Sequence, residues 1–262
     1  MEPLVQLKSD IEDLERCRLN PAVQMPPWQS NESVREQLDG SLRTKMLEWG
    51  CTPGRKALVV GATWPRLVND LADRGMFVTL VDDDADRVKQ VSEAAGAAGH
   101  LTKVTVICSD YVQRRFEPSS FNLMIMWDTL NRYPEVRPII RKATRELKTG
   151  GLFFLRSWVT ASSDPGFFSR FKKPAPDSVD RAELNEVVDE FLVIQDSIPH
   201  HFSAPKAANL AASGGSLKAK MLSAALEADR RLLETNPDKS RFLAMLCAKE
   251  KQLGKVSLQF RG

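Results

Sequence analysis

The amino-acid sequence predicts an α/β fold built on a doubly wound, mostly parallel β-sheet. From residue 55 onward, short apolar runs alternate with amphipathic segments of about 10–15 residues, a pattern typical of repeated strand–helix–strand units. Glycines follow several amphipathic segments, as at Gly75 and Gly99, where helices commonly end. The 262 residues suffice for one large domain with a small appendage. These observations together predict parallel strands joined by crossover helices.

Seven segments have the composition of strands: residues 56–62, 76–84, 103–110, 121–129, 152–159, 192–202 and 241–250. Helices are predicted between them at residues 66–75, 85–99, 135–151, 178–191 and 217–234. The small-residue stretch 203–216 is typical of a mobile loop, and the last strand is expected to end the sheet as a hairpin. Residues 160–182 and 203–216 are candidate lid loops.

Two amphipathic helices are predicted before the first strand. Leu4, Leu7, Ile11 and Leu14 recur at helical spacing, and a second helix is expected to open near Ser33. We therefore expect an N-terminal helical cap over residues 1–52, packed beside a core domain over residues 53–262.

Composition excludes several classes of protein. A net charge of +3 is too small to indicate a nucleic-acid or membrane-surface protein. The basic surplus after residue 202 suits either an acidic partner or, more simply, a solvated helix face. The four cysteines are scattered without a CxxC pair, which argues against a metal site and favours a reducing compartment. Without a signal segment or an apolar run of about 18 residues, we expect a cytoplasmic protein without a membrane segment.

Candidate ligand-binding residues lie at the predicted carboxyl ends of the strands, where ligands bind in open parallel sheets. They are Gly61, Asp82, Asp110 and the pair Trp127–Asp128. Asp82 follows Gly61 by about 20 residues, a spacing that suits a carboxylate bound to ribose hydroxyls. The simpler alternative is an acidic helix start, favoured by the helix dipole.

The order of these segments resembles the class I S-adenosylmethionine-dependent methyltransferases. The segments are ALVVGA, VTLVDDD, VTVICSDY, FNLMIMWDTLNRYPE and LKTGGLFFL, and the resemblance spans about Arg55 to Val159. It implies a Rossmann-like, seven-stranded sheet with an antiparallel last strand. It also implies S-adenosyl-L-methionine (SAM) as the cofactor and a small-molecule substrate.

The resemblance also implies roles for particular residues. Asp82 and Asp83 would face the ribose, Asp110 would meet the adenine amino group, and Tyr111 would border the adenine ring. Gly61, Ala62 and Thr63 would form the first cofactor loop, and Trp127 would lie near the methionine end and the substrate.

The first loop departs from the family pattern. The family usually has an acidic residue before G-x-G-x-G, whereas this chain has Val59 or Val60 there and has Thr63 and Pro65 in place of the later glycines. Trp64 is large enough to project into the cofactor space. Pro65 is easier to accommodate, because proline suits the first turn of a helix.

Four residues are candidates for acid–base catalysis: Asp128, Tyr133, His200 and His201. Methyl transfer needs a base only when the nucleophile must lose a proton, and neutral imidazole is a common base near pH 7. Because adjacent strand residues point to opposite faces, at most one of the two histidines is expected to face a given pocket.

Two other functions stay open. A chain that has lost its loop acid and glycines could be a non-catalytic scaffold or interaction protein, acting as a homodimer or with another protein. A nicotinamide-dependent dehydrogenase would need G-x-G-x-x-G to seat a pyrophosphate, and those positions here are Gly61, Thr63 and Arg66.

Overall fold

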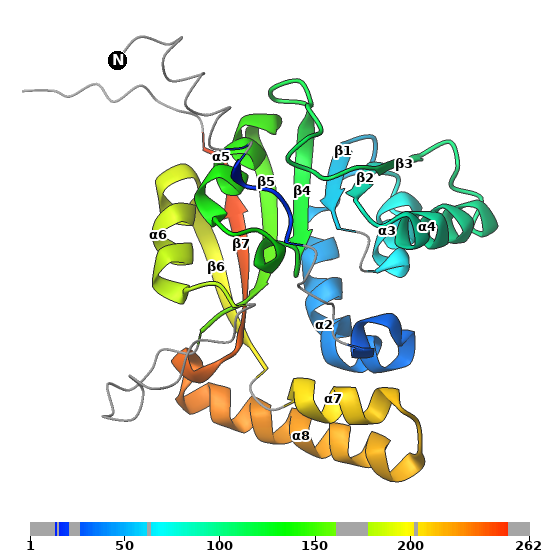
Figure 1. Cartoon of the computed structure of the whole chain (residues 1–262), viewed down its shortest axis with the longest axis vertical. Helices are drawn as coiled ribbons and strands as arrows, with labels where there is room; N and C mark the ends of the chain where they lie inside the picture. Colours follow the sequence, from blue (N-terminus) through cyan, green and yellow to red (C-terminus); the bar gives the residue numbers. More distant parts are fainter. Residues whose placement is uncertain are drawn as a thin grey trace, which may run out of the picture.

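The computed structural model describes residues 14, 16–20, 27–61, 64–160, 178–201 and 204–250. Their strands form one seven-stranded sheet in the order β3-β2-β1-β4-β5-β7-β6 (Figure 1). The strands are β1 (Lys56–Val60), β2 (Phe77–Asp82), β3 (Val104–Cys108), β4 (Phe121–Trp127), β5 (Leu147–Trp158), β6 (Val193–His200) and β7 (Phe242–Ala248). The predicted fold class is confirmed.

Strand direction follows the prediction as well. β1 to β5 pair in parallel, and β7 is antiparallel to both β5 and β6. The sheet grows from β1 in two directions, toward β2 on one side and toward β4 on the other. This reversal is the point at which open α/β sheets bind ligands, outside the carboxyl ends of the strands.

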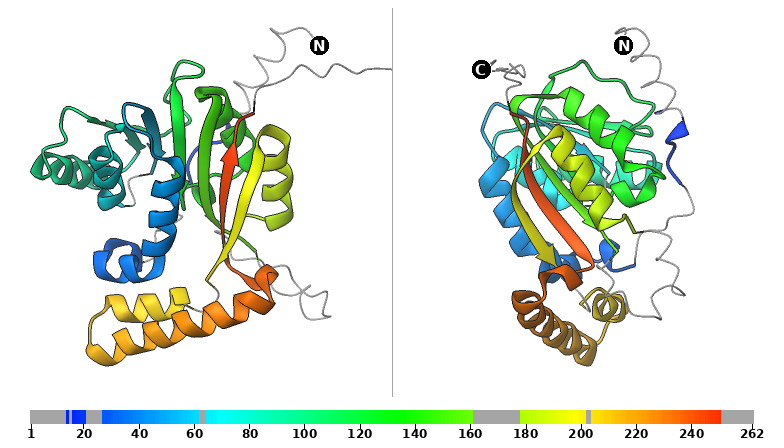
Figure 2. Two further views of the ribbon diagram at one scale, coloured as in Figure 1. Left: turned by 180° about the vertical axis from the view of Figure 1, so that it is seen from behind. Right: turned by 90° about the vertical axis from the view of Figure 1, so that its left-hand side faces the viewer.

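Helices cover both faces of the sheet (Figure 2). The helical elements are η1 (Pro27–Ser30), α2 (Glu32–Gly50), α3 (Pro65–Asp73), α4 (Ala85–Ala97), η2 (Leu130–Arg132), α5 (Val136–Glu146), α6 (Arg181–Phe191), α7 (Ala204–Ala212), α8 (Ser216–Thr235) and η4 (Pro237–Lys239). Helices α5 and α6 share one core cluster with the sheet, whereas α2, α3 and α4 share the other.

The two faces explain the continuous apolar runs of the central strands. In β1, Leu58 and Val60 belong to the α5–α6 core, whereas Ala57 and Val59 belong to the α2–α4 core. A strand buried on both faces has no polar side to alternate with its apolar side, as is usual in parallel sheets.

Two boundaries differ from the prediction. The segment expected to be a mobile loop at 203–216 contains helix α7, because its alanines favour helix strongly and Pro205 sits in the first turn, where proline is tolerated. Strand β5 begins at Leu147, so the LKTGG segment belongs to the strand and not to the preceding helix.

Helix α2 connects the sheet to an outer helical layer. Leu42 and Met46, in its second half, join the core of the sheet, whereas Val34 and Leu38 pack in a third cluster with residues of α7 and α8. Most of the predicted N-terminal helix, including Leu4, Leu7 and Ile11, lies outside the described residues, as do residues 161–177 of the first candidate lid. No described helix has the length and apolarity to cross a membrane.

Candidate functional site

The sequence-predicted residues gather along the carboxyl edge of the sheet. Gly61 follows β1, Asp82 ends β2, Asp110 follows β3 and Asp128 follows β4. Because β2, β1 and β4 are neighbours, the predicted ribose carboxylate and the segment after β4 lie on either side of the first loop.

Gly61 allows the ends of β1 and β4 to approach closely. Its φ of 93° lies in the region that side chains rarely adopt, and an added Cβ would lie 2.5 Å from Thr129 Oγ1. The Thr129 hydroxyl donates to the Val60 carbonyl at 2.7 Å, which ties the two strand ends together. Ala62 and Thr63 lie outside the described residues.

Trp64 anchors the first loop to helix α2. Its indole Nε1 donates to both carboxylate oxygens of Glu32 at 3.1 Å, and its ring meets Trp127 edge-on with centroids 5.5 Å apart. The Arg35 guanidinium lies 4.6 Å from the ring centroid. The side chain is buried in the α2–α4 core, so its contacts belong to the protein interior.

The predicted ribose carboxylates are already paired with arginines. Asp82 Oδ1 accepts from Arg87 at 2.8 Å and from the backbone N–H of Asp84 at 2.8 Å. Arg132, from the segment after β4, lies 2.7 Å from Asp83 and 3.9 Å from Asp82. The Asp82 side chain is fully buried, whereas Asp83 stays about one-third exposed and is the more accessible carboxylate.

Asp110 and Tyr133 are hydrogen-bonded to one another. The Tyr133 hydroxyl donates to Asp110 Oδ1 at 3.2 Å, and the backbone N–H of Leu19 donates to Oδ2 at 3.3 Å. Burial, followed by the charge of Asp110, raises the pKa of Tyr133 well above its usual value. Tyr133 therefore stays protonated near neutral pH and is a donor to Asp110 rather than a base.

Tyr111 is directed into the protein interior. Its hydroxyl donates to Glu146 Oε2 at 2.7 Å, and Lys142 Nζ lies 3.9 Å from the ring centroid. The ring is almost completely buried.

A group of polar side chains, all buried except the half-buried His200, lies near the end of β4, and we call it the polar edge cluster. Its members are Gln29, Asp39, Asp128, Arg156, His200 and His201. Arg156, on β5, forms ion pairs with Asp39 at 2.9 Å and with Asp128. The Gln29 amide donates to Asp128 Oδ2 at 2.8 Å, so η1, α2, β4 and β5 meet at these charges.

Asp128 has the properties of a carboxyl group poised for proton transfer. Burial raises its pKa to about 6, with Arg156 opposing and Asp39 adding to the effect. Its Oδ1 atom is buried and has no hydrogen-bond partner among the described residues. A buried carboxylate oxygen is costly to leave unpaired, which suggests a ligand or water as its partner.

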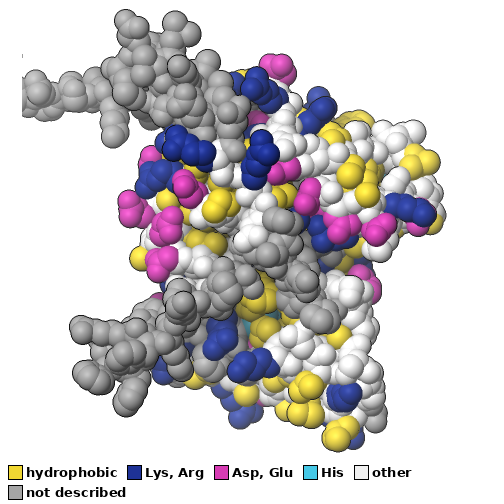
Figure 3. All heavy atoms as spheres, in the orientation of Figure 1, with side chains coloured by type: hydrophobic (Ala, Val, Ile, Leu, Met, Phe, Trp, Pro, Cys, Tyr) yellow, Lys and Arg dark blue, Asp and Glu magenta, His cyan; other side chains and the backbone are white. Residues whose placement is uncertain are grey.

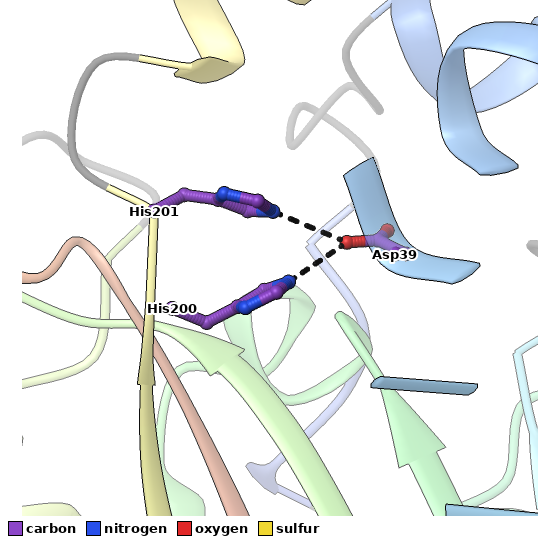
Figure 4. A group of neighbouring side chains, drawn as sticks. All are labelled: Asp39, His200 and His201. Atoms are coloured by element: carbon purple, nitrogen blue, oxygen red, sulfur yellow. Dashed lines mark ion pairs between the residues drawn. The ribbon is translucent and has the colours of Figure 1, made fainter. Parts of the chain in front are cut away.

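The two histidines converge on one carboxylate, contrary to the expectation from strand alternation (Figure 4). Nε2 of His200 lies 3.4 Å, and Nε2 of His201 3.6 Å, from Asp39 Oδ1. The ring centroids are 3.7 Å apart. The cause is the backbone: His201 follows the end of β6 and has a φ of 58°, which turns its side chain to the side of His200.

The histidines and Asp39 have defined protonation preferences. Burial, and then the neighbouring His201, lower the pKa of His200 to about 4, so the ring is neutral at pH 7. Burial opposes ionisation of Asp39, but Arg156 and the histidines hold its pKa well below the usual range. The ionised carboxylate only accepts hydrogen bonds, which favours the proton of neutral His200 on Nε2 and leaves Nδ1 unprotonated.

The same three residues offer one metal-ligand atom each within 4.8 Å of one another. Two observations disfavour a metal. Arg156 already occupies Asp39 Oδ1 and would place a second cation beside any ion. Nε2 of His201 lies 3.1 Å from the Leu38 carbonyl, and a nitrogen that donates there has no lone pair for a metal.

Other unpaired polar atoms near Asp128 suit the methionine end of SAM. Among the described residues, Gln29 Oε1, Trp28 Nε1 and Trp127 Nε1 are buried without a hydrogen-bond partner. The two indole N–H groups are donors suited to a carboxylate, and the Gln29 oxygen is an acceptor suited to an ammonium group. The donor and acceptor types of these residues therefore match the charged groups at the methionine end of the cofactor that the family resemblance implies.

Sequence reasoning missed Gln29, Asp39 and Arg156. A signal for Asp39 was available, because Arg35, Asp39 and Arg43 recur every four residues beside the apolar stripe of α2. Arg156 had a weaker signal, a lone charge inside an otherwise apolar strand segment.

Comparisons with known proteins agree with this architecture. A family model described as "Methyltransferase domain" matches residues 58–155. No curated protein sequence matches the chain.

Several solved structures share the fold. The [4+2]-cyclase SpnF has a TM-score of 0.62 and 18% identity, over 94% of this chain and 95% of that chain. Coclaurine N-methyltransferase, bound to N-methylheliamine and S-adenosylhomocysteine (SAH), has a TM-score of 0.61 and 13% identity, over 95% and 90%. Geranyl diphosphate C-methyltransferase from Streptomyces coelicolor A3(2), in complex with Mg²⁺, geranyl diphosphate and SAH, has a TM-score of 0.59 and 14% identity. The match covers 88% of this chain and 85% of that chain. The chain therefore contains a segment that matches the methyltransferase-domain model and shares its overall fold with SAM-dependent methyltransferases.

Proposed function

We propose that the chain transfers the methyl group of SAM to a small-molecule acceptor at the carboxyl edge of the sheet, with Asp128 as the proton acceptor. The observation that carries this proposal is Asp128 itself. It follows β4 beside the first loop, its Oδ1 has no partner among the described residues, and its pKa is raised to about 6. Such a pKa suits a general base near neutral pH.

The residues proposed to hold the cofactor run along the same edge. Asp83 and Asp82 would serve the ribose hydroxyls, Asp110 the adenine amino group, and Gln29 and Trp28 the methionine end. Gly61 would keep the loop backbone close to the ligand, with Ala62, Thr63 and Trp127 beside it.

The bound sulfonium supplies an activated methyl group, so the protein mainly has to position the acceptor and exclude water. Burial of the polar edge cluster supports the second task. When the acceptor carries a proton on its nucleophilic atom, that proton would pass to Asp128 Oδ1 as the new bond to carbon forms. His200, neutral and oriented by Asp39, is the second candidate base.

A non-catalytic role is the alternative, and two observations favour it. The first loop lacks the family's acid and later glycines, and the predicted adenosine carboxylates Asp82 and Asp110 are already bonded to groups of the chain itself. A structure of this fold is described as a [4+2]-cyclase, so chemistry other than methyl transfer is a further outcome to consider.

Formation of SAH from SAM, measured by mass spectrometry with a panel of phenol, enol, carboxylic acid and amine acceptors, tests the proposal. Asp128→Asn should lower kcat by about 100- to 10,000-fold and leave SAH affinity nearly unchanged. The decline of wild-type kcat/KM below about pH 6 should be absent in this variant. Asp238→Asn, at an exposed carboxylate, is the matched control and should keep full activity.

Comparing the effect of Asp128→Asn on kcat with its effect on SAH affinity distinguishes a role in proton transfer from a role in cofactor binding. A weaker SAH affinity with unchanged kcat would mean that Asp128 holds the cofactor's ammonium group and is not the base. Binding of SAM without SAH formation from any acceptor would favour the non-catalytic alternative.

A further inference from the structure

Helices α7 and α8 form a hairpin outside the layers that cover the sheet. In Figure 1 they lie beneath α2, and the turn between them is at their outer end. Helix α7 packs on α2 and η1, and α8 packs mainly on α7. Ala204, Ala208 and Leu222 form the inner side of the hairpin.

The outer end of the hairpin exposes large apolar side chains. Six such side chains are exposed among the described residues, and three of them are here: Leu210 (49% exposed), Leu217 (71%) and Met221 (47%). Leu217 and Met221 are four residues apart in α8 and therefore lie on one face of the helix. They flank the turn that contains Gly214 and Gly215.

The same end is basic. Lys218 and Lys220 lie beside the turn, Lys206 lies at the start of α7, and residues 204–226 contain no Asp or Glu. Among the described residues no carboxylate pairs with these lysines, and Lys218 donates only to the Ser213 hydroxyl. The far half of α8 differs, since Arg230 and Arg231 there pair with Glu227. Figure 3 shows hydrophobic and basic side chains together at this lower end of the molecule.

We propose that the outer end of the α7–α8 hairpin docks on an anionic lipid bilayer, with Leu210, Leu217 and Met221 in the interface and Lys218 and Lys220 at the headgroups. Apolar side chains beside lysines match the interfacial region of such a bilayer. A bilayer suits this shape better than a protein partner, because three side chains around a turn supply little of the roughly 1,000 Å² that a stable protein interface buries.

The proposal differs from the expectation drawn from the whole-chain charge. The net charge of +3 averages over acidic and basic surfaces, whereas residues 204–226 carry three lysines and no acids. Docking on the surface needs no membrane-spanning helix. It is independent of the proposed methyl transfer, so each can fail without the other.

Co-sedimentation of the full chain with vesicles tests docking. Vesicles of phosphatidylcholine with about one-third phosphatidylserine should bind the protein, and phosphatidylcholine alone should bind it much less. Leu217→Ser with Met221→Ser should weaken binding at least tenfold, and Lys218→Gln with Lys220→Gln should weaken it and reduce its salt dependence. Leu101→Ser is the matched control, since Leu101 is 67% exposed elsewhere and should not matter.

Two results would overturn the proposal. One is the absence of binding to the anionic vesicles by a wild-type chain with a cooperative thermal transition. The other is equal binding by the Leu217/Met221 double variant. A wild-type dimer in light scattering that this double variant abolishes, together with no vesicle binding, would assign the surface to a second copy of the chain.

Discussion

At the scale of single residues, the backbone is strained where the polar edge cluster is built. Asp128 and His201 have φ values of 57° and 58°, in the left-handed region that non-glycine residues rarely adopt. Such conformations persist where surrounding contacts hold them, and they gather at functional sites. Here the contacts are the Arg156 ion pair of Asp128 and the Leu38 and Asp39 contacts of His201.

Gly61→Ala tests the close approach of β1 and β4. The new Cβ would meet Thr129 Oγ1 at 2.5 Å in a backbone that already disfavours side chains, so we expect a loss of about 2–4 kcal/mol of unfolding free energy. Gly54→Ala is the matched control, because Gly54 has a similar φ of 76° but nothing within 4 Å. Urea unfolding should show the larger loss for Gly61→Ala, and equal losses would refute the close-contact explanation.

The sequence placed the site residues more reliably than it predicted their partners. Asp82, Asp110 and Asp128 could be placed at strand ends, because strand boundaries are visible as changes in composition. Their bonds to Arg87, Tyr133 and Arg156 depend on side-chain directions that a one-dimensional pattern does not contain. The convergence of the histidines depended on one backbone angle beyond β6.

At the scale of elements, the turn from β1 to α3 is held by Trp64, which stands between Thr63 and Pro65, the two positions where the family usually has its later glycines. Trp64 joins this turn to α2 through Glu32 and to β4 through Trp127. The turn is therefore attached to two neighbouring elements by its side chain. This attachment explains how a bulky side chain is accommodated beside the positions that are usually glycine.

Substitution of Trp64 separates anchoring from blockage of the cofactor site. Trp64→Gly should lower the unfolding free energy by about 3–5 kcal/mol, because it leaves a cavity in the core, and should not strengthen SAH binding. Trp64→Phe keeps a ring but loses the bond to Glu32, and should cost about 1–2 kcal/mol. Tighter SAH binding by the glycine variant would show that the indole fills the cofactor site.

The order of the strands and helices could be predicted because apolar periodicity changes at each boundary. The burial of charged residues on α2 could not be predicted in this way. Its Arg35–Asp39–Arg43 stripe faces inward because distant elements, including β5 and the end of β6, supply opposite charges or acceptors. The loop prediction at 203–216 was wrong because small residues are common in both loops and alanine-rich helices.

At the scale of the whole molecule, two groups of the polar edge cluster give opposite dependences of stability on pH. The folded-state pKa of Asp128 is raised from 3.8 to about 6, so its contribution makes the folded protein less stable as pH rises through that range. The folded-state pKa of His200 is lowered from 6.5 to about 4, so its contribution makes the folded protein more stable as pH rises over nearly the same range. At 1.36 kcal/mol per pKa unit, each pKa shift changes the free energy of unfolding by about 3 kcal/mol across this pH range. Because the two changes have opposite signs, they nearly cancel in the wild-type protein.

Variants should reveal the two slopes. His200→Gln leaves the effect of Asp128 and should be less stable at pH 6.5 than at pH 4.5. Asp128→Asn leaves the effect of His200 and should be more stable at pH 6.5 than at pH 4.5. Urea unfolding at the two pH values checks this, with the wild type changing little between them. Slopes of the same sign in both variants would contradict the assigned protonation states.

The central claim is that the carboxyl edge of the sheet binds SAM despite its altered first loop. Isothermal titration calorimetry of the full chain with SAM and with SAH, using NAD as the control, tests it most directly. We expect micromolar binding of both adenosyl ligands and none of NAD. No heat from either adenosyl ligand would mean that the chain's own bonds to Asp82 and Asp110 close the site, and would contradict the proposed methyl transfer.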